Sequence, residues 1–205
     1  MAEREARAGA DGLLRCPWGA HPADYAEYHD REWGVPLRGE AALFERITLE
    51  AFQSGLSWLT ILRKREAFRR AFVGFDPARV AEFGEAERAA LLADAGIVRN
   101  RAKIDAAIGN ARAVLELGGG LDELLWSFAP EEPRVRPLTA EQVPATTPES
   151  VAMARELKRR GFAFVGPTTC YAMMQAVGMV DDHLRDCWRA SSAAAPQGAG
   201  EVSAR

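Results

Sequence analysis

Apolar residues recur every three or four positions along much of the chain, which is the spacing of a helix with one buried face. The clearest stretch is 40–53, whose apolar positions are Leu43, Phe44, Ile47, Ala51 and Phe52. Gly55 interrupts the pattern, and a second stretch begins near Trp58, with apolar positions at Leu59, Leu62, Phe68 and Phe72. The pattern predicts two helices joined by a short turn.

The same spacing predicts further helices on both sides of a proline-rich segment. Asp76-Pro77 is typical of a helix start, because the carboxylate can cap free amides and proline suits the first helical position. The segment 129–147 contains four prolines and little periodicity, which favours a surface loop. The expected helices are 77–83, 85–95, 100–115, 121–128, 148–160 and 168–178.

The sequence predicts an all-α fold, since it contains neither an internal repeat nor an alternating pattern sufficient for a sheet. Residues 1–12 and 190–205 are small, polar and rich in Gly, Ala and Ser, so both are expected to be disordered tails. The folded part is therefore expected to span 13–189, as one domain or as one domain with a smaller subdomain.

The composition is that of a globular protein rather than a membrane protein. It is 48% hydrophobic and 27% charged, and no run approaches the ~18 apolar residues that a membrane span needs. The first residues are charged, so no secretory signal is expected and a cytoplasmic location follows. The formal net charge of −3 does not indicate a nucleic-acid partner, so the local placement of Lys and Arg matters more.

Two Cys/His pairs are candidates for a metal site. His183 and Cys187 are four residues apart, which places both side chains on one face of a helical turn. Cys16 and His29 form a second pair near the start of the expected domain, and four such ligands would make a closed, structural zinc site. Spacing alone leaves open the alternative of ordinary buried cysteines and hydrogen-bonded core histidines.

Aromatic residues are concentrated in the first third of the chain, at Trp18, Tyr25, Tyr28, Trp33 and Trp58. A slot of aromatic rings suits an unstacked nucleic-acid base, and a cationic base gains a cation–π contribution in such a slot. Core packing is the alternative for each ring. The cluster is therefore a candidate base pocket rather than a demonstrated one.

Glu50 lies among the apolar positions of 40–53. If its side chain faces a pocket, the carboxylate can accept a hydrogen bond from a base and stabilise positive charge. If it faces solvent, it is an ordinary surface carboxylate.

Basic residues gather where one expected helix ends and the next begins. Arg99, Arg101 and Lys103 follow Gly96, within a helix–turn–helix over 86–112. Such a turn directs backbone N–H groups and cations to one place, which suits a DNA phosphate. The alternative is a solvated charged face.

Together these motifs resemble the type I 3-methyladenine DNA glycosylases, a branch of the helix–hairpin–helix glycosylases. The resemblance covers about 175 of the 205 residues and ends at Cys187. Its motifs are RCPW at 15–18, AEYHDREWGVP at 26–36, LEAFQSGLSWLTILRKREAFRRAF at 49–72, AGIVRNRAKIDAAIGNARA at 95–113 and KRRGFAFVGPTTCYAMMQAVGMVDDH at 158–183. One departure is Asp181, which stands where the family often has Asn.

The resemblance implies a helix–hairpin–helix DNA glycosylase fold in which a zinc site ties the N-terminal segment to the C-terminal one. The implied zinc ligands are Cys16, His29, His183 and Cys187. The implied base pocket contains Glu50 as the catalytic residue, with Tyr28, Trp18 and Trp58 as base-binding residues and Trp33 nearby. The implied DNA contacts are the Gly55-Leu56 turn and the hairpin residues Arg99, Arg101 and Lys103.

The implied activity is release of free 3-methyladenine from alkylated double-stranded DNA by a monomeric enzyme, leaving an abasic site. An enzyme that also nicks DNA would need a lysine for a Schiff base, but Lys64, Lys103 and Lys158 are expected to be exposed in basic clusters. The enzyme is therefore expected to be monofunctional.

Two other classes of function remain open at this point. One is a zinc-stapled DNA-binding module without catalysis. The other is a zinc hydrolase, in which three of the four residues hold the metal and a water molecule is activated.

Overall fold

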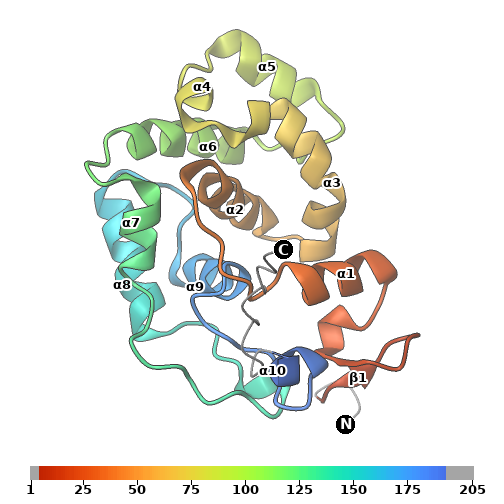
Figure 1. Ribbon diagram of the computed structural model, residues 1–205. Helices are drawn as coiled ribbons and strands as arrows, with labels where there is room; N and C mark the ends of the chain where they lie inside the picture. The colour runs from red at the N-terminus through yellow and green to blue at the C-terminus, as the bar shows by residue number, and fades with distance from the viewer. Residues whose placement is uncertain (1–4, 193–205) are drawn as a thin grey trace, which may run out of the picture. The chain divides into compact units, whose positions relative to one another are not determined.

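The computed structural model describes residues 5–192, and its contacts divide the chain into two compact units (Figure 1). The small unit comprises Met1–Arg31, Val135–Val143 and Asp182–Arg205, and the large unit comprises Glu32–Arg134 and Pro144–Asp181. Of the expected tails 1–12 and 190–205, residues 1–4 and 193–205 lie outside the described residues. Ala190 was expected to lie in a tail but is 5% exposed and belongs to a short helix.

The large unit is mostly helical, and the predicted helices are found there with small changes at their ends. Asp76 caps its helix as expected, with its carboxylate accepting from the amides of Ala78 and Arg79. The elements are α2 Glu40–Gln53, α3 Trp58–Ala71, η2 Val73–Phe75, α4 Pro77–Ala81, α5 Glu85–Ala93, α6 Arg101–Leu115, α7 Gly120–Trp126, α8 Pro148–Arg159 and α9 Pro167–Ala176.

Helix α2 is the centre of the large unit, where it packs against α3, α6, α7 and α9 (Figure 1). A helix surrounded on all sides must be apolar nearly all round, and α2 is buried without interruption from Ile47 to Phe52. This arrangement also buries the carboxylate of Glu50, which is 5% exposed. The solvated alternative for Glu50 is therefore excluded.

Phenylalanine rings form much of the core beside α2. Phe52 lies 4.8 Å from Phe68, and Phe72 stacks on Phe75 at 5.5 Å, measured between ring centroids. Each fully buried ring stabilises the fold by roughly 2–3 kcal/mol through the area it removes from water. That gain offsets the left-handed backbone of Phe75, whose φ is 57°. Leu115, the last residue of α6, is 53% exposed.

The small unit joins three separate stretches of chain. Its elements are β1 Arg7–Ala8, β2 Leu14–Arg15, η1 Pro17–Gly19, α1 Ala23–Arg31, η3 Ala140–Gln142 and α10 Trp188–Ser192. The middle stretch is tied in by backbone carbonyls, since Pro137 accepts from the Arg185 amide and Ala190 accepts from the Arg136 guanidinium.

The start of the small unit differs from the sequence expectation. Arg7 pairs with Arg15 and Ala8 with Leu14 in a short antiparallel ribbon, so a described strand lies within the expected tail 1–12. Alternating periodicity could not predict strands of two residues. The ribbon is closed by Arg15, whose guanidinium binds Asp11 at 2.7 Å.

Candidate functional site

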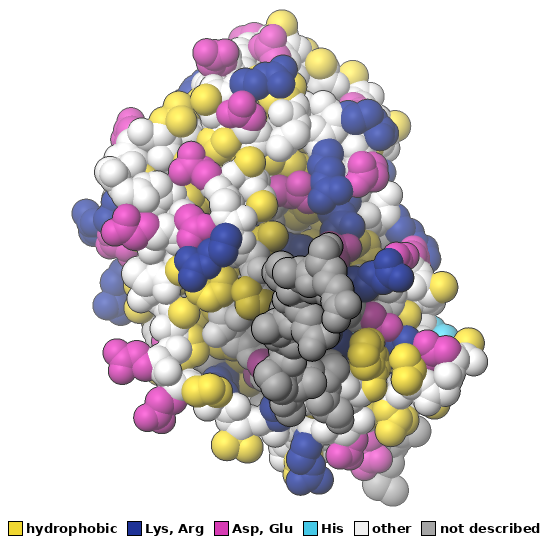
Figure 2. All heavy atoms as spheres, in the orientation of Figure 1, with side chains coloured by type: hydrophobic (Ala, Val, Ile, Leu, Met, Phe, Trp, Pro, Cys, Tyr) yellow, Lys and Arg dark blue, Asp and Glu magenta, His cyan; other side chains and the backbone are white. Residues whose placement is uncertain are grey.

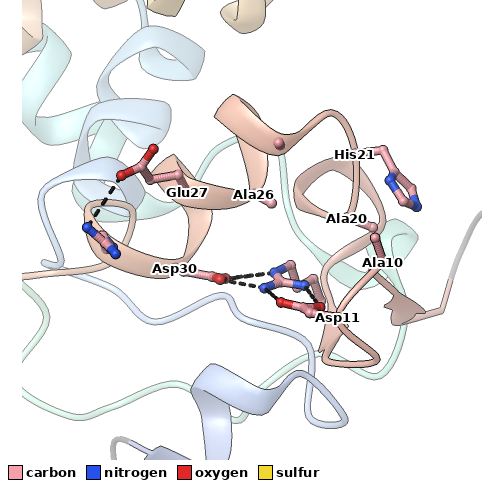
Figure 3. A pocket seen from close by; sticks show the side chains of 10 residues that line it. Ala10, Asp11, Ala20, His21, Ala26, Glu27 and Asp30 are labelled. Atoms are coloured by element: carbon pink, nitrogen blue, oxygen red, sulfur yellow. Dashed lines mark hydrogen bonds and ion pairs between the residues drawn. The ribbon is translucent and has the colours of Figure 1, made fainter.

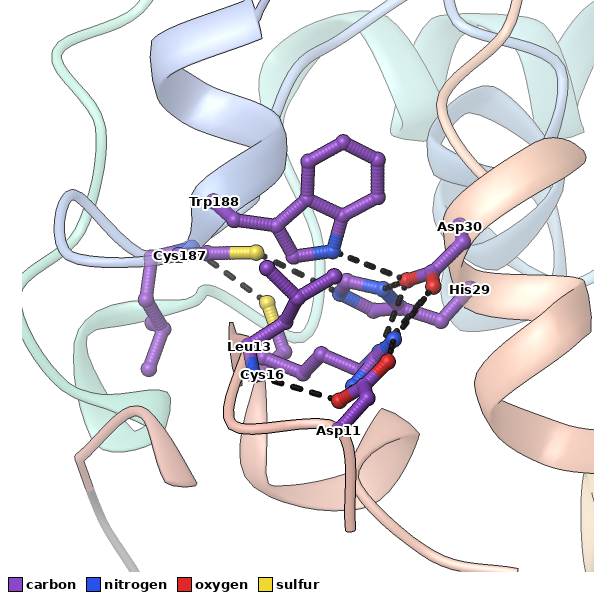
Figure 4. Close-up of polar contacts among 9 residues, drawn as sticks. Asp11, Leu13, Cys16, His29, Asp30, Cys187 and Trp188 are labelled. Atoms are coloured by element: carbon purple, nitrogen blue, oxygen red, sulfur yellow. Dashed lines mark hydrogen bonds and ion pairs between the residues drawn. The ribbon is translucent and has the colours of Figure 1, made fainter. Parts of the chain in front are cut away.

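Three of the four predicted metal ligands converge in the small unit. The ligand atoms of Cys16, His29 and Cys187 all lie within 4.8 Å of one another, and all three residues are buried (Figure 4). Helix α1 carries His29, whereas Cys16 precedes η1 and Cys187 precedes α10. The fourth residue, His183, is also buried, and its ring centroid lies 5.1 Å from that of His29 in an edge-on arrangement.

The hydrogen bonds of His29 suit a metal ligand. Its Nδ1 lies 2.8 Å from a carboxylate oxygen of Asp30, which places the ring proton on Nδ1. Its Nε2 faces the Cys187 Sγ at 3.5 Å. A histidine held through one nitrogen by a carboxylate, with the other nitrogen turned toward thiols, is the usual arrangement around zinc.

Asp30 is the hub of the polar contacts behind His29. Its carboxylate accepts from the Trp188 indole at 3.0 Å and from the Arg15 guanidinium at 2.6 Å (Figure 4). Figure 3 shows Asp11 and Asp30 meeting on that one guanidinium. Burial raises the pKa of Asp30, but hydrogen bonds from Arg15, His29 and Trp188 outweigh it and hold the pKa below its ordinary value. Asp30 therefore stays ionised and keeps His29 oriented.

The two thiols shift each other's pKa in opposite directions. Because the Cys16 thiol donates to it and the His29 ring lies beside it, the pKa of Cys187 falls well below its ordinary value. The same hydrogen bond, together with burial, raises the pKa of Cys16. The Leu184 amide also donates to the Cys16 sulfur at 3.4 Å. A backbone donor and a thiolate are features that a structural metal site uses.

The small unit also holds two of the predicted base-binding aromatics. Trp18 is half-buried, and its ring centroid lies 4.9 Å from Tyr25 and 6.2 Å from Tyr28. Trp18 also meets His29 edge-on at 5.1 Å. Trp18 and the candidate metal ligand His29 are thus adjacent, so a change in the position of His29 would also move the aromatic ring of Trp18.

The large unit holds the predicted catalytic carboxylate and a second aromatic group. Burial raises the pKa of Glu50 to about 7, and the nearby Arg46 guanidinium opposes that rise. Arg46 lies one turn earlier on α2, and its Cζ is 5.0 Å from the Trp58 ring centroid. Trp58 is 8% exposed, and Trp33 is half-buried in the same unit. The sequence analysis did not identify Arg46, although its position four residues before Glu50 on a predicted helix places the two side chains on one face.

The turn between α2 and α3 is built as the sequence predicted. Gly55 has a φ of 81°, which strains any residue with a side chain, and Leu56 is 42% exposed. The Leu56 amide donates to the Gln53 carbonyl at 2.6 Å and closes the turn. The turn presents an apolar side chain to solvent at a fixed position.

Lys103 was predicted to be exposed in a basic cluster, and that prediction is wrong. Lys103 is 8% exposed, and its Nζ donates to the carbonyls of Phe52 at 2.8 Å and Ser54 at 2.6 Å. These carbonyls belong to the end of α2, where backbone acceptors lack helical partners. Lys103 therefore holds the Gly55-Leu56 turn in place from below, and burial lowers the pKa of its ammonium group.

The turn between α5 and α6 exposes the other two predicted cations. Arg99 and Arg101 are exposed, and Asn100 caps α6 by accepting from the Lys103 amide at 3.1 Å. The Lys64 ammonium on α3 donates to the carbonyls of Ala95 and Gly96, which fixes the turn. Over α3, α4 and α5, at the top of Figure 2, basic side chains are interspersed with acidic ones.

The matching family model is described as methyladenine glycosylase and spans residues 18–190. The chain belongs to this family. Its members are hydrolases that act on N-glycosyl bonds. The family model covers the residues predicted from the sequence for the base pocket and the DNA contacts, and all of the predicted metal ligands except Cys16.

Individual relatives agree with that assignment over nearly their whole length. The chain is 47% identical to DNA-3-methyladenine glycosylase 1 of Escherichia coli over 179 residues, which is 85% of this chain and 96% of the relative. A crystal structure of 3-methyladenine DNA glycosylase I matches with a TM-score of 0.81 at 45% identity, covering 85% of this chain and 98% of the other. A variant of 3-methyladenine DNA glycosylase I in complex with 3-methyladenine matches with a TM-score of 0.80 at 34% identity, covering 85% and 96%.

Among the described residues, no helix combines the length and the apolar character needed to cross a bilayer.

Proposed function

We propose that this chain is a DNA glycosylase of base-excision repair that releases 3-methyladenine from alkylated duplex DNA. The observation that carries the proposal is the buried carboxylate of Glu50, whose electrostatic partner Arg46 lies over the ring of Trp58. A buried carboxylate beside an aromatic ring suits a flat cationic base, because the base can stack on the ring and donate to the carboxylate. The named relatives act on or bind the same base.

The reaction needs little acid catalysis from the protein. An adenine methylated at N3 carries positive charge, so its bond to the sugar breaks with the electron pair leaving on the base. Water then adds to the sugar carbon and gives up a proton, which yields free 3-methyladenine and an abasic site. The protein's task is to extrude the nucleotide, recognise the base and stabilise the positive charge as it moves from the base to the sugar.

The base-binding roles are proposed for each unit by itself. In the large unit, Glu50 accepts a hydrogen bond from the base and Trp58 stacks on it, and Trp33 lies in the same unit. In the small unit, Tyr28 and Trp18 carry a phenol and an indole, and their base-binding role comes from the family resemblance. Each role is a proposal that rests on the chemistry of its side chain and on the family resemblance.

The DNA contacts are proposed for two turns of the large unit. The α5–α6 turn is assigned as the hairpin of a helix–hairpin–helix motif, with Arg99 and Arg101 near a phosphate. Leu56 is exposed on the neighbouring α2–α3 turn, where an apolar side chain suits the gap left by an extruded base. Lys103 acts beneath that turn rather than on the phosphate.

A structural zinc ion is proposed for Cys16, His29, Cys187 and His183. The converging sulfur and nitrogen atoms and the carboxylate behind His29 support this assignment. A bound zinc would supply cross-linking of the chain segments rather than catalysis, because four protein ligands leave no place for water.

The enzyme is proposed to be monofunctional and monomeric. A Schiff-base mechanism needs a neutral lysine at the sugar, but Lys103 is bound to two carbonyls and Lys64 to two others. A cytoplasmic location is also proposed, since the cysteines of the described residues are free thiols.

The deciding experiment measures the bases released from methylated duplex DNA by chromatography with mass detection. Wild-type protein is expected to release 3-methyladenine but not 7-methylguanine, and Glu50→Gln to lower kcat/KM about 100-fold, a loss of about 3 kcal/mol. Glu45→Gln is the matched control, because Glu45 lies on the same helix but binds Arg69. It is expected to keep wild-type activity.

The same experiment separates the other two classes of function. Tight binding to alkylated DNA without release of base would favour the DNA-binding module. Loss of activity on chelation with an unchanged melting curve would favour a zinc hydrolase, whereas a structural metal costs stability and activity together.

A further inference from the structure

Arg46 and Glu50 form a buried ion pair on one face of α2. They are four residues apart, and Arg46 Nη1 lies 4.0 Å from Glu50 Oε1. The side chains are 7% and 4% exposed, so neither charge is well solvated. Removing an arginine from water costs several kcal/mol unless a partner compensates, and a helical core position would normally hold Leu or Met. The presence of arginine here therefore calls for a functional reason.

The neighbouring carboxylates already have other arginines. Glu32 is held by Arg65 at 2.5 and 2.9 Å, and Glu45 is held by Arg69 at 2.8 Å. The charge of Arg46 also lowers the pKa of Glu32, but by less than the charge of Arg65 does. On Glu50, in contrast, Arg46 is the charge that favours the ionised form.

The guanidinium of Arg46 also lies over the Trp58 ring at 5.0 Å. A planar cation therefore touches the same two groups that are proposed to receive the methylated base. This contact restrains the indole and places positive charge beside the carboxylate before any DNA is bound.

We propose that Arg46 is a positioning residue that favours the ionised form of Glu50 and keeps Trp58 oriented while the base pocket is empty. The inference deepens the proposed function and rests on Glu50 as the acceptor for the base. A protonated Glu50 would lose the negative charge that attracts a cationic base. Arg46 thus sets the lowest pH at which the enzyme works.

Other charges near α2 do not take this role. Helix α9 carries no carboxylate, amine or guanidinium, and η2 carries no charged side chain. The other elements packed against α2 carry titratable or charged side chains, but none of these shifts the pKa of Glu50. They include Arg65 and Arg69 on α3, Arg79 on α4, Lys103 on α6, Asp122 on α7, and Cys170 and Tyr171 on α9.

The test is the pH profile of kcat/KM for release of 3-methyladenine by wild-type protein, Arg46→Met and Arg46→Lys. The acidic limb of this profile reports the carboxyl of the free enzyme, and the wild-type midpoint is expected near 7. Without the cation the carboxyl protonates more readily, so the limb of Arg46→Met moves to higher pH. About tenfold loss is expected at pH 6.5 for a shift of roughly one unit, with recovery by pH 9.

Arg46→Lys should restore most of the acidic limb, because it keeps the charge. Arg69→Met is the matched control on the packed helix and should leave the limb unchanged. A uniform loss at every pH in Arg46→Met would overturn the inference, since it would mean that Arg46 serves only packing. Recovery of kcat/KM at high pH would show that Arg46→Met is folded, because a damaged fold would lower kcat/KM at every pH.

A second readout covers the case in which activity is lost altogether. Carbon NMR of the Glu50 carboxyl gives its pKa directly in wild-type protein and in Arg46→Lys and Arg46→Met. A higher pKa in Arg46→Met supports the inference, and an unchanged pKa overturns it. Wild-type protein that releases no base would instead overturn the proposed function, so the two failures are distinguishable.

Discussion

The small and large units are stabilised by different chemistry. The large unit buries phenylalanine rings around α2, which is apolar over most of its surface. The small unit buries Cys16, His29 and Cys187, and behind them the buried Arg15 binds the half-buried Asp30. One unit depends on apolar area removed from water, and the other on a few polar groups that must all be satisfied at once. The two should therefore fail under different treatments.

The largest expected effect is loss of the proposed metal site at Cys16, His29 and Cys187. Cys187→Ala, or removal of the metal by a strong chelator, should destabilise the small unit by up to about 10 kcal/mol, because ligand binding there is folding energy. Calorimetry should show a lost or lowered transition together with zinc content near zero. Cys170→Ala is the control, since Cys170 is a buried cysteine of the large unit and is not a member of the Cys–His cluster. Equal metal content in the two variants would refute the assignment.

A core truncation should have the opposite signature. Phe72→Ala removes a fully buried ring that stacks on Phe75 and should lower the free energy of unfolding by about 3–5 kcal/mol. Zinc content measured by mass spectrometry should stay at the wild-type level. If Phe72→Ala also released the metal, the two units would not be energetically separate.

Asp30→Asn tests the support behind the cluster without removing a ligand. The amide cannot replace the negative charge that His29, Arg15 and Trp188 share, so zinc affinity should fall about 10–100-fold. Competition against a coloured chelator measures this change. Glu27→Gln is the control on the same helix, because Glu27 is exposed and pairs with Arg31. Unchanged zinc affinity in Asp30→Asn would show that the carboxylate only holds Arg15 of the β1–β2 ribbon and does not support His29.

The smallest effect is expected beneath the α2–α3 turn. Lys103→Met keeps the buried stem but leaves the carbonyls of Phe52 and Ser54 without this donor, which should cost about 1–2 kcal/mol. Hydrogen exchange at the Leu56 amide should become faster. Lys64→Met is the comparison, since it removes a more exposed ammonium from the other turn, and it should leave Leu56 unchanged.

The sequence allowed the large unit to be predicted better than the small one, and the reason is physical. A helix such as 40–53 has apolar residues at regular helical spacing, and Glu50 could be recognised as a carboxylate among those apolar positions. Helix α1 spans nine residues and each strand of the β1–β2 ribbon spans two, so these elements offer few positions over which a period can be recognised.

The sequence also gave a wrong prediction for the exposure of one long side chain, that of Lys103. Lys103 sits next to the apolar stripe of α6, so its stem could be buried while its ammonium reached the end of another helix. The outcome depended on which carbonyls lay within reach, and a single sequence does not contain that information. The predicted metal ligands Cys16, His29 and Cys187 were brought together as expected, because ligand chemistry restricts the possible partners more than periodicity does.

The wide separation of Cys16 and Cys187 has a consequence for biosynthesis. During translation Cys16 and His29 emerge early, whereas Cys187 follows some 170 residues later. At ordinary rates of synthesis the interval is on the order of ten seconds or more. For that time the early thiol has no partner from the end of the chain and is open to oxidation or to stray metal ions. The small unit can therefore close only after Cys187 has been synthesised, so a chain interrupted before that residue cannot complete it.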